Sequence, residues 1–214
     1  MIPTEVKNII FDLGGVLLDI DVERTIEAFR RLKLPDVIKK GGWDYKHDTF
    51  LNMEKGLLSE AEFRDGVREL LPFYVADNKI NDAWCAMIIR FDEEKIKIVQ
   101  GLSKRFKIYL FSNTNSIHVR YFTNMFLSQF GFPLSELFVK DYYSNDIELR
   151  KPEPRAFQHV LDDAGLIPEE TLFIDDLKAN TDAARSLGIH VIYLKRNMIF
   201  KNIFEQESLK IMVK

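Results

Sequence analysis

Cysteine, net charge and long apolar runs are all scarce in this chain of 214 residues. Cys85 is the only cysteine, which makes an intrachain disulfide impossible and a structural zinc site unexpected. No stretch approaches the roughly 20 consecutive apolar residues that a membrane-spanning helix requires, so no membrane partner is expected. The net charge is only −3, which gives no reason to expect nucleic acid as a partner.

The first five residues also lack the charged and then apolar layout of a signal peptide, so we expect a cytoplasmic protein. Hydrophobic residues make up 46% of the chain and charged residues 29%, a balance typical of soluble globular proteins. A chain of this length can bury one good core, or one core and a smaller satellite domain. We expect a monomer or a homodimer.

A predicted buried strand that runs into an aspartate lies close to the N-terminus. Val6–Phe11 is apolar enough to be buried on both faces, like a central strand of a parallel sheet. Asp12 follows at once, and Gly14 and Gly15 then allow the backbone to turn tightly. Because the carboxyl end of a strand in an α/β fold faces the crevice where ligands bind, Asp12 is our candidate for the centre of the chemistry.

Two kinds of sequence pattern follow this strand. From about Asp21 to Phe91 apolar residues recur at helical spacing without a convincing strand, which predicts a small helical bundle. Beyond Phe91 strands and helices alternate, as in βαβ units with a parallel sheet. The predicted strands are Phe106–Phe111, Leu137–Val139, Thr171–Ile174 and His190–Leu194; the predicted helices are Glu94–Lys104, Ser116–Gln129, Pro154 to Gly165, and Lys178–Leu187.

These patterns predict an α/β fold with a doubly wound, mostly parallel sheet and an inserted helical cap. The catalytic core would comprise residues 1–18 and 92–214, and the cap residues 19–91. Cap motion around a buried site is common in enzymes, so we expect hinges at Leu18–Ile20 and Arg90–Asp92.

Several aromatic, histidine and cysteine residues are better explained by packing than by function. Aromatic residues of a small bundle usually form its core, although contact with a substrate stays open for them. Histidines without ligand spacing are expected to be structural, and the C-terminal apolar residues are expected to pack on the core. The residues concerned are Trp43, Tyr45, His47, Phe50, Cys85, His118, His159, His190, Ile199, Phe200, Ile203 and Phe204.

Polar residues follow three of the predicted strands and stand in one of the loops. The carboxyl ends of parallel strands meet at one edge of a sheet, so these residues are expected to converge. Carboxylates, hydroxyl and amide donors and one cation at one edge suit a Mg²⁺ ion and a phosphate group. The residues are Asp12, then Ser112 and Asn113, then Lys151, then Asp175 and Asp176.

In this order the residues resemble the four motifs of the haloacid dehalogenase-like superfamily, most members of which are Mg²⁺-dependent phosphatases. The resemblance covers nearly the whole chain, including a helical cap between the first and second motifs. The phrases Phe11–Val16, Leu110–Asn115 and Arg150–Glu153 look most like the bacterial glucose-1-phosphate phosphatase branch. That branch is also similar to the N-terminal phosphatase domain of soluble epoxide hydrolases.

The resemblance implies a small phosphorylated metabolite as substrate and a role for each motif residue. Asp12 would be the nucleophile that forms an aspartyl-phosphate, and Lys151 would neutralise the repulsion between carboxylate and phosphate. Ser112 and Asn113 would bind the phosphate together with Lys151. The metal ligands implied are Asp12, the backbone carbonyl of Gly14, Asp176 and, directly or one step removed, Asp175.

Gly14 departs from the superfamily pattern, in which a second aspartate at this position serves as general acid and base. Losing a positioned acid typically costs about 10²–10⁴-fold in rate. Because the penalty shrinks when the leaving group is already stabilised, Gly14 favours sugar 1-phosphates as substrates. Asp19, Asp21 and His47 are candidates to supply the proton instead.

Three other activities fit parts of the pattern. A metal-independent dehalogenase would use Asp12 to attack carbon, but it would gain nothing from the pair Asp175-Asp176. A phosphoglucomutase would need an acid–base group that Gly14 does not provide. A catalytically weak, phosphate-binding regulatory protein would fit the loss of that group.

Overall fold

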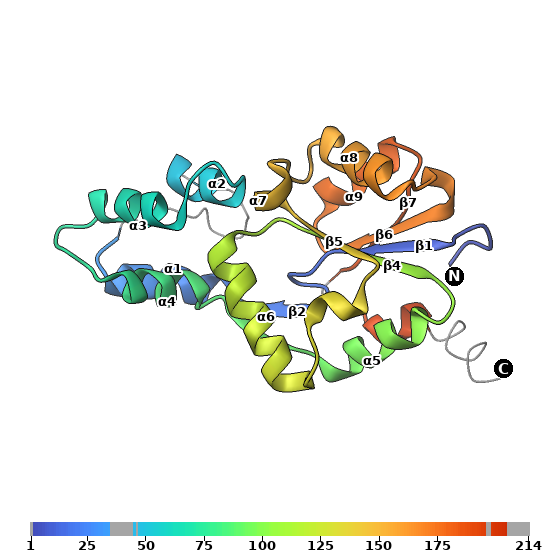
Figure 1. Ribbon diagram of the computed structural model, residues 1–214, viewed down its shortest axis with the longest axis horizontal. Helices are drawn as coiled ribbons and strands as arrows, with labels where there is room; N and C mark the ends of the chain where they lie inside the picture. The colour runs from blue at the N-terminus through green and yellow to red at the C-terminus, as the bar shows by residue number, and fades with distance from the viewer. Residues whose placement is uncertain (1, 35–44, 46, 196–197, 205–214) are drawn as a thin grey trace.

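A parallel five-stranded sheet in the order β5-β4-β1-β6-β7 lies at the centre of the larger part of the molecule (Figure 1). The computed structural model describes residues 2–34, 45, 47–195 and 198–204. In the sheet β1 is central and runs parallel to both β4 and β6, which confirms the predicted fold class. The strands are β1 (Asn8–Phe11), β4 (Lys107–Ser112), β5 (Lys140–Tyr143), β6 (Thr171–Asp175) and β7 (His190–Tyr193).

Helices cover both faces of this sheet, α8 and α9 one face and α5 and α6 the other (Figure 1). Successive side chains of a strand point to opposite faces, so β1 contributes to two cores. Ile10 packs in the core under α8 and α9, whereas Ile9 and Phe11 pack in the core under α5 and α6. The helices are α5 (Glu93–Leu102), α6 (Ser116–Phe130), the short α7 (Ser144–Ile147), α8 (Pro154–Ala164) and α9 (Lys178–Ser186).

The predicted ends of α8 are confirmed. Pro154 occupies the first turn, where its missing N–H is not needed, and Gly165 ends the helix in the left-handed region with φ of 61°. This helix ends close to the positions expected from sequence because both of its boundaries are marked by residues with special backbone geometry.

Four helices form a separate cluster at one end of the molecule (Figure 1). Trp84 is fully buried at its centre, with the rings of Phe50, Phe63 and Phe29 between 5.2 and 6.2 Å from it. Phe50 is therefore a core residue, as predicted, whereas Trp43 lies outside the described residues. The helices are α1 (Val22–Arg31), α2 (Asp48–Glu54), α3 (Glu60–Glu69), which begins with a capping box formed by Ser59 and Glu62, and α4 (Asp77–Cys85).

Two secondary-structure predictions made from the sequence are wrong. The region from Asp21 to Phe91 does contain a strand, because β3 (Ile88–Phe91) pairs antiparallel with β2 (Leu18–Ile20) at the base of the cap. The strand expected at Leu137–Val139 begins later, as β5, and a 3₁₀ turn occupies Leu134–Leu137.

The C-terminal apolar residues pack on the core only in part. Phe200 and Phe204 are buried and each lies 6.2 Å from the ring of Phe11, whereas Ile199 is exposed. No helix in the described part of the chain is long and apolar enough to cross a membrane.

Candidate active site

Three neighbouring strands deliver the predicted site residues to one edge of the sheet. β1 ends at Phe11, and Asp12 follows with its N–H donating to the carbonyl of Ile174 at 2.9 Å. β4 ends at Ser112 and β6 ends at Asp175. Because β4, β1 and β6 are adjacent and parallel, residues far apart in sequence meet at their carboxyl ends.

Lys151 joins all three of these strand ends through its ammonium group. Its Nζ donates to Asp12 Oδ1 at 2.6 Å, to Asp175 Oδ2 at 2.8 Å and to the carbonyl of Phe111 at 2.7 Å. The side chain is 1% exposed, and a cation this deeply buried is stable only with such partners. Burial lowers the pKa of Lys151, but the charges of Asp12 and Asp175 outweigh it, so the net pKa is raised and the ammonium stays charged.

Asp12, Asp175 and Asp176 form an acidic cluster. One oxygen from each carboxylate lies within 4.8 Å of the others. The pKa of Asp12 is raised to about 8, because burial together with the charges of Asp175 and Asp176 outweighs the opposing effect of Lys151. Repulsion of this kind is relieved by a divalent cation, which favours the ionised carboxylates.

Asp175 is held by contacts on both of its oxygens. The N–H of Leu177 donates to Oδ1 at 2.8 Å, and the Asn180 amide lies 3.0 and 2.9 Å from Oδ1 and Oδ2. These contacts, with the bond from Lys151 to Oδ2, fix its orientation. Asn180 is a residue that the sequence reading missed, since a lone asparagine inside a predicted helix carries no functional signal.

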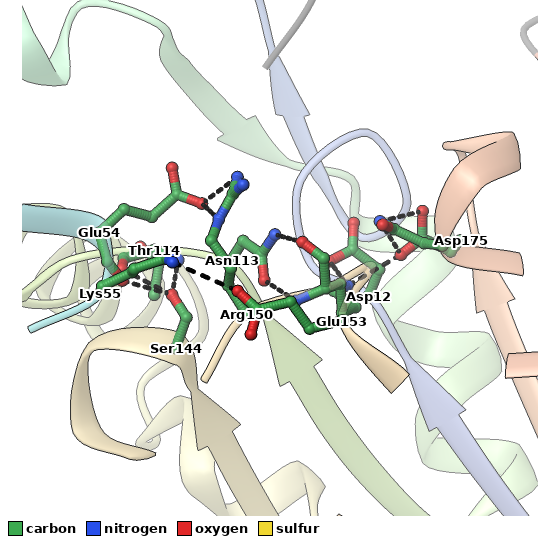
Figure 2. Close-up of polar contacts among 11 residues, drawn as sticks. Asp12, Glu54, Lys55, Asn113, Thr114, Ser144, Arg150, Glu153 and Asp175 are labelled. Carbon is green, nitrogen blue, oxygen red and sulfur yellow. Dashed lines mark hydrogen bonds and ion pairs between the residues drawn. The ribbon is translucent and has the colours of Figure 1, made fainter. Parts of the chain in front are cut away.

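The side chain of Asn113 holds the backbone of the lysine loop. Its amide donates to the carbonyl of Lys151 at 2.8 Å, and its carbonyl oxygen accepts from the N–H of Lys151 at 2.9 Å (Figure 2). This two-bond pairing places Lys151 against the end of β4. Both Asn113 and Ser112 line the cavity described next, and their binding of phosphate stays a prediction.

A cavity of about 60 Å³ lies over this edge of the sheet, between the strand ends and the cap. Asp12, Ser112, Asn113, Lys151, Asp176 and Asn180 line it together with Gly14. Most of the other lining residues are apolar. Two further polar groups, Glu54 and His118, also face it. The lining residues are Asp12, Leu13, Gly14, Leu18, Ile20, Glu54, Met87, Ile88, Ser112, Asn113, Thr114, His118, Phe122, Lys151, Asp176, Leu177 and Asn180.

The three residues considered as alternative proton donors do not line this cavity. Asp19 pairs with Arg90 at 3.4 Å and with Lys95 at 3.2 Å. Asp21 caps α1, and His47 caps α2 by accepting from the N–H of Thr49 at 3.3 Å. Their local roles in helix caps and ion pairs explain these residues.

His118 combines a structural role with a place in the cavity wall. Its ring stacks on Trp84 at 4.7 Å, and Nε2 lies 3.0 Å from the carbonyl of Trp84. Burial lowers the pKa of His118 to about 4, so the ring is neutral at pH 7 and Nε2 must carry the proton. The expected structural role is confirmed, and the position at the cavity was not foreseen.

Comparisons with known proteins agree with this geometry. Residues 6–188 match the family described as haloacid dehalogenase-like hydrolase. The chain is 33% identical to D-ribitol-5-phosphate phosphatase of Bacteroides thetaiotaomicron over 183 residues, 86% of this chain and 89% of that protein. It is 26% identical to a phosphorylated carbohydrates phosphatase of Thermotoga maritima over 203 residues, 87% of this chain and 84% of that protein.

A solved structure matches the fold over nearly the full length. It is the wild-type haloacid dehalogenase family enzyme bt-2542 of Bacteroides thetaiotaomicron in complex with magnesium and inorganic phosphate. The TM-score is 0.85 at 37% identity, with 93% of this chain and 99% of that chain covered. These relatives do not single out the glucose-1-phosphate phosphatase branch to which the motif phrases pointed.

Proposed function

The chain belongs to the haloacid dehalogenase-like hydrolase family, and from that premise we propose that it is a Mg²⁺-dependent phosphatase of small phosphorylated sugars or polyols. The observation that carries this proposal is the acidic cluster with Lys151 beside it. Three carboxylates against one ammonium leave a formal charge of −2 when all four groups are ionised. A hard divalent cation matches both that charge and the oxygen ligands, so the residues fit Mg²⁺.

We assign the metal to Asp12, Asp176 and the backbone carbonyl of Gly14, with Asp175 adding charge beside them. We place Asp175 beside the metal because both of its oxygens already accept hydrogen bonds from Lys151, Leu177 or Asn180. When bound, Mg²⁺ would shield the negative charge of the phosphate and keep Asp12 ionised. A metal complex with phosphate in bt-2542 supports the assignment.

In the proposed reaction Asp12 attacks phosphorus, a bond forms between its carboxylate oxygen and phosphorus, and the bond to the leaving-group oxygen breaks. Lys151, which bonds Asp12 at 2.6 Å, holds the nucleophile in place and offsets its repulsion from the phosphate. Ser112 and Asn113 bind phosphate oxygens at the end of β4. Water then attacks the aspartyl-phosphate and releases inorganic phosphate, which regenerates Asp12.

The leaving group needs a proton, and the cavity offers no obvious donor. In the described residues that line it, the ionisable groups are Asp12, Asp176, Lys151, Glu54 and the neutral His118. We therefore keep the hypothesis that Gly14 favours activated leaving groups such as sugar 1-phosphates. D-ribitol 5-phosphate, the substrate in the name of one relative, is the competing candidate, since its leaving group is an ordinary alkoxide.

The test is release of inorganic phosphate from a panel of phosphate esters with Mg²⁺ and with EDTA, and of halide from 2-haloacids. The panel should include glucose 1-phosphate, glucose 6-phosphate and D-ribitol 5-phosphate. Metal-dependent phosphate release supports the proposal. Metal-independent halide release would support a dehalogenase instead, and tight phosphate binding without turnover a regulatory protein. Equal efficiency with glucose 1-phosphate and glucose 6-phosphate would remove the hypothesis about Gly14.

A further inference from the structure

Glu54, the last residue of α2, brings a carboxylate from the cap to the wall of the catalytic cavity. We propose that this carboxylate recognises hydroxyl groups on the leaving group of the substrate and so sets its preference for polyhydroxylated phosphate esters. The inference rests on the proposed phosphatase function and adds a specificity residue to it. Among the described residues that line the cavity, Glu54 is the only carboxylate outside the acidic cluster.

Glu54 is buried, with only 3% of its surface exposed. The guanidinium of Arg150 pairs with it, with Nε at 3.1 Å and Nη2 at 2.8 Å from the same oxygen, Oε1 (Figure 2). The nearby negative charge of Glu54, after burial itself, also raises the pKa of Tyr45, so the phenol stays protonated. Held by the guanidinium, the carboxylate of Glu54 has oxygens that can accept hydrogen bonds from a substrate.

The backbone of Glu54 is fixed against the catalytic edge, as a residue that reads a substrate requires. The hydroxyl of Ser144 lies 2.7 Å from the carbonyl of Glu54 and 3.0 Å from that of Thr114, and it accepts from the N–H of Thr114 at 2.9 Å (Figure 2). Next in the chain, Lys55 pairs with Glu153 at 3.3 Å. The end of α2 is thus tied to the residues on both sides of Lys151.

The pairing with Arg150 also decides which chemistry Glu54 can recognise. The carboxylate and the guanidinium cancel in charge, so the pair offers little attraction to a cationic leaving group such as an aminoalcohol. His118 also lines the cavity, and because its Nε2 carries the ring proton, its other ring nitrogen has a lone pair that can accept a hydrogen bond. Two acceptors in an otherwise apolar wall suit a neutral leaving group that donates through hydroxyls.

The test compares kcat/KM for D-ribitol 5-phosphate with kcat/KM for p-nitrophenyl phosphate, whose leaving group carries no hydroxyl to donate when bound. Glu54→Gln keeps the shape of the side chain and removes its charge, and Glu54→Asp keeps the charge but withdraws it by one methylene. Loss of a hydrogen bond to a charged group is worth about 10- to 100-fold. We expect the ratio of the two kcat/KM values to fall by about that factor in Glu54→Gln, and by less in Glu54→Asp.

Glu60→Gln is the matched control. Glu60 is a second cap carboxylate that pairs with an arginine of the core, Arg120, at 2.7 Å, but it does not line the cavity. We expect the ratio in this variant to stay within about threefold of wild type, the scatter of a surface pair. If Glu54 only holds the cap closed, kcat/KM will fall by the same factor for both substrates in Glu54→Gln, and the ratio will not change.

Three outcomes overturn the inference. An unchanged ratio in both Glu54 variants, with folding confirmed by thermal melting, shows that Glu54 does not read hydroxyls. A wild-type preference for phosphoethanolamine over D-ribitol 5-phosphate shows a site for a cation. Wild-type protein that hydrolyses no phosphate ester at all, including p-nitrophenyl phosphate, defeats the proposed function and the inference with it.

Discussion

Gly15 lies so close to Asp176 that a side chain at position 15 would displace the carboxylate of Asp176. A Cβ atom on Gly15 would be 2.7 Å from Cγ of Asp176, and the φ of Gly15 is +76°, in the left-handed region. The second glycine after β1 thus serves both the turn and the approach of the carboxylate that follows β6. It links the first and the last of the sequence motifs in space.

Gly15→Ala should weaken metal binding by moving Asp176. We expect the Mg²⁺ concentration for half-maximal activity to rise by about 10- to 100-fold, as is typical when the support of a metal ligand is disturbed. The check is a Mg²⁺ titration of phosphate release. Gly101→Ala, in α5 with no atom within 4 Å of its added Cβ, is the control and should leave the titration unchanged. Equal titrations for the two variants would contradict the account.

Lys151→Met should destabilise the protein and make its stability depend strongly on Mg²⁺. Removing one partner of a buried ion pair costs about 3–5 kcal/mol, because uncompensated charge is left behind. Here Asp12 and Asp175 would face each other without the ammonium. The measurement is urea unfolding with EDTA and with Mg²⁺, and the metal should restore more stability to the variant than to the wild type.

The control for this prediction is Lys140→Met. Lys140 pairs with Asp163 at 2.6 Å, but its side chain is 51% exposed, so its loss should cost less than about 1 kcal/mol. If Lys151→Met costs no more than Lys140→Met, the ammonium of Lys151 is not what balances the carboxylates.

Acid should destabilise the protein through His118. Its pKa is about 4 in the folded protein, because burial lowers it from the ordinary value of 6.5. Between these values the unfolded chain binds a proton that the folded chain does not, so the free energy of unfolding falls as the pH falls from 6.5 towards 4. The whole pKa difference lowers the free energy of unfolding by about 3 kcal/mol, at about 1.4 kcal/mol for each pKa unit. Urea unfolding at pH 7 and pH 4.5 measures it.

His118→Gln, which can still donate to the carbonyl of Trp84, should show a smaller loss of stability over the same pH range. His190→Gln is the matched control, since His190 has a side chain that is 32% exposed. A pH dependence identical in wild type and His118→Gln would show that His118 does not carry this effect.

The central strands and their polar ends were predictable from sequence for a physical reason. A strand buried on both faces is continuously apolar, and the first charged residue after it marks the edge of the sheet, as at Asp12 and Asp175. β3 was missed because Met87 and Ile88 continue the helical spacing of α4, while the partner of β3 is far away in sequence, at Leu18–Ile20.

The cap side of the site was not predictable. Nothing local in the sequence around Glu54 indicates that its carboxylate meets Arg150, because the two lie on different elements and only the folded chain brings them together. Asn180 was missed for a different reason: its partner Asp175 is only five residues away, but a lone asparagine inside a predicted helix carries no functional signal. The role of Lys151 was assigned from the resemblance of its motif to the superfamily. Its contacts with Asp12 and Asp175 supply the physical reason for that role.

Asp12 is the proposed nucleophile of a Mg²⁺-dependent phosphatase. The most direct test of this role measures phosphate release by Asp12→Asn in saturating Mg²⁺. Asp19→Asn is the control, because Asp19 is a nearby carboxylate that pairs with Arg90 and Lys95 and does not line the cavity. We expect kcat of Asp12→Asn to fall by about 10³-fold or more, as expected for removal of a nucleophile. Asp19→Asn should stay within about threefold of wild type. Asp12→Asn that retains wild-type turnover would contradict this role.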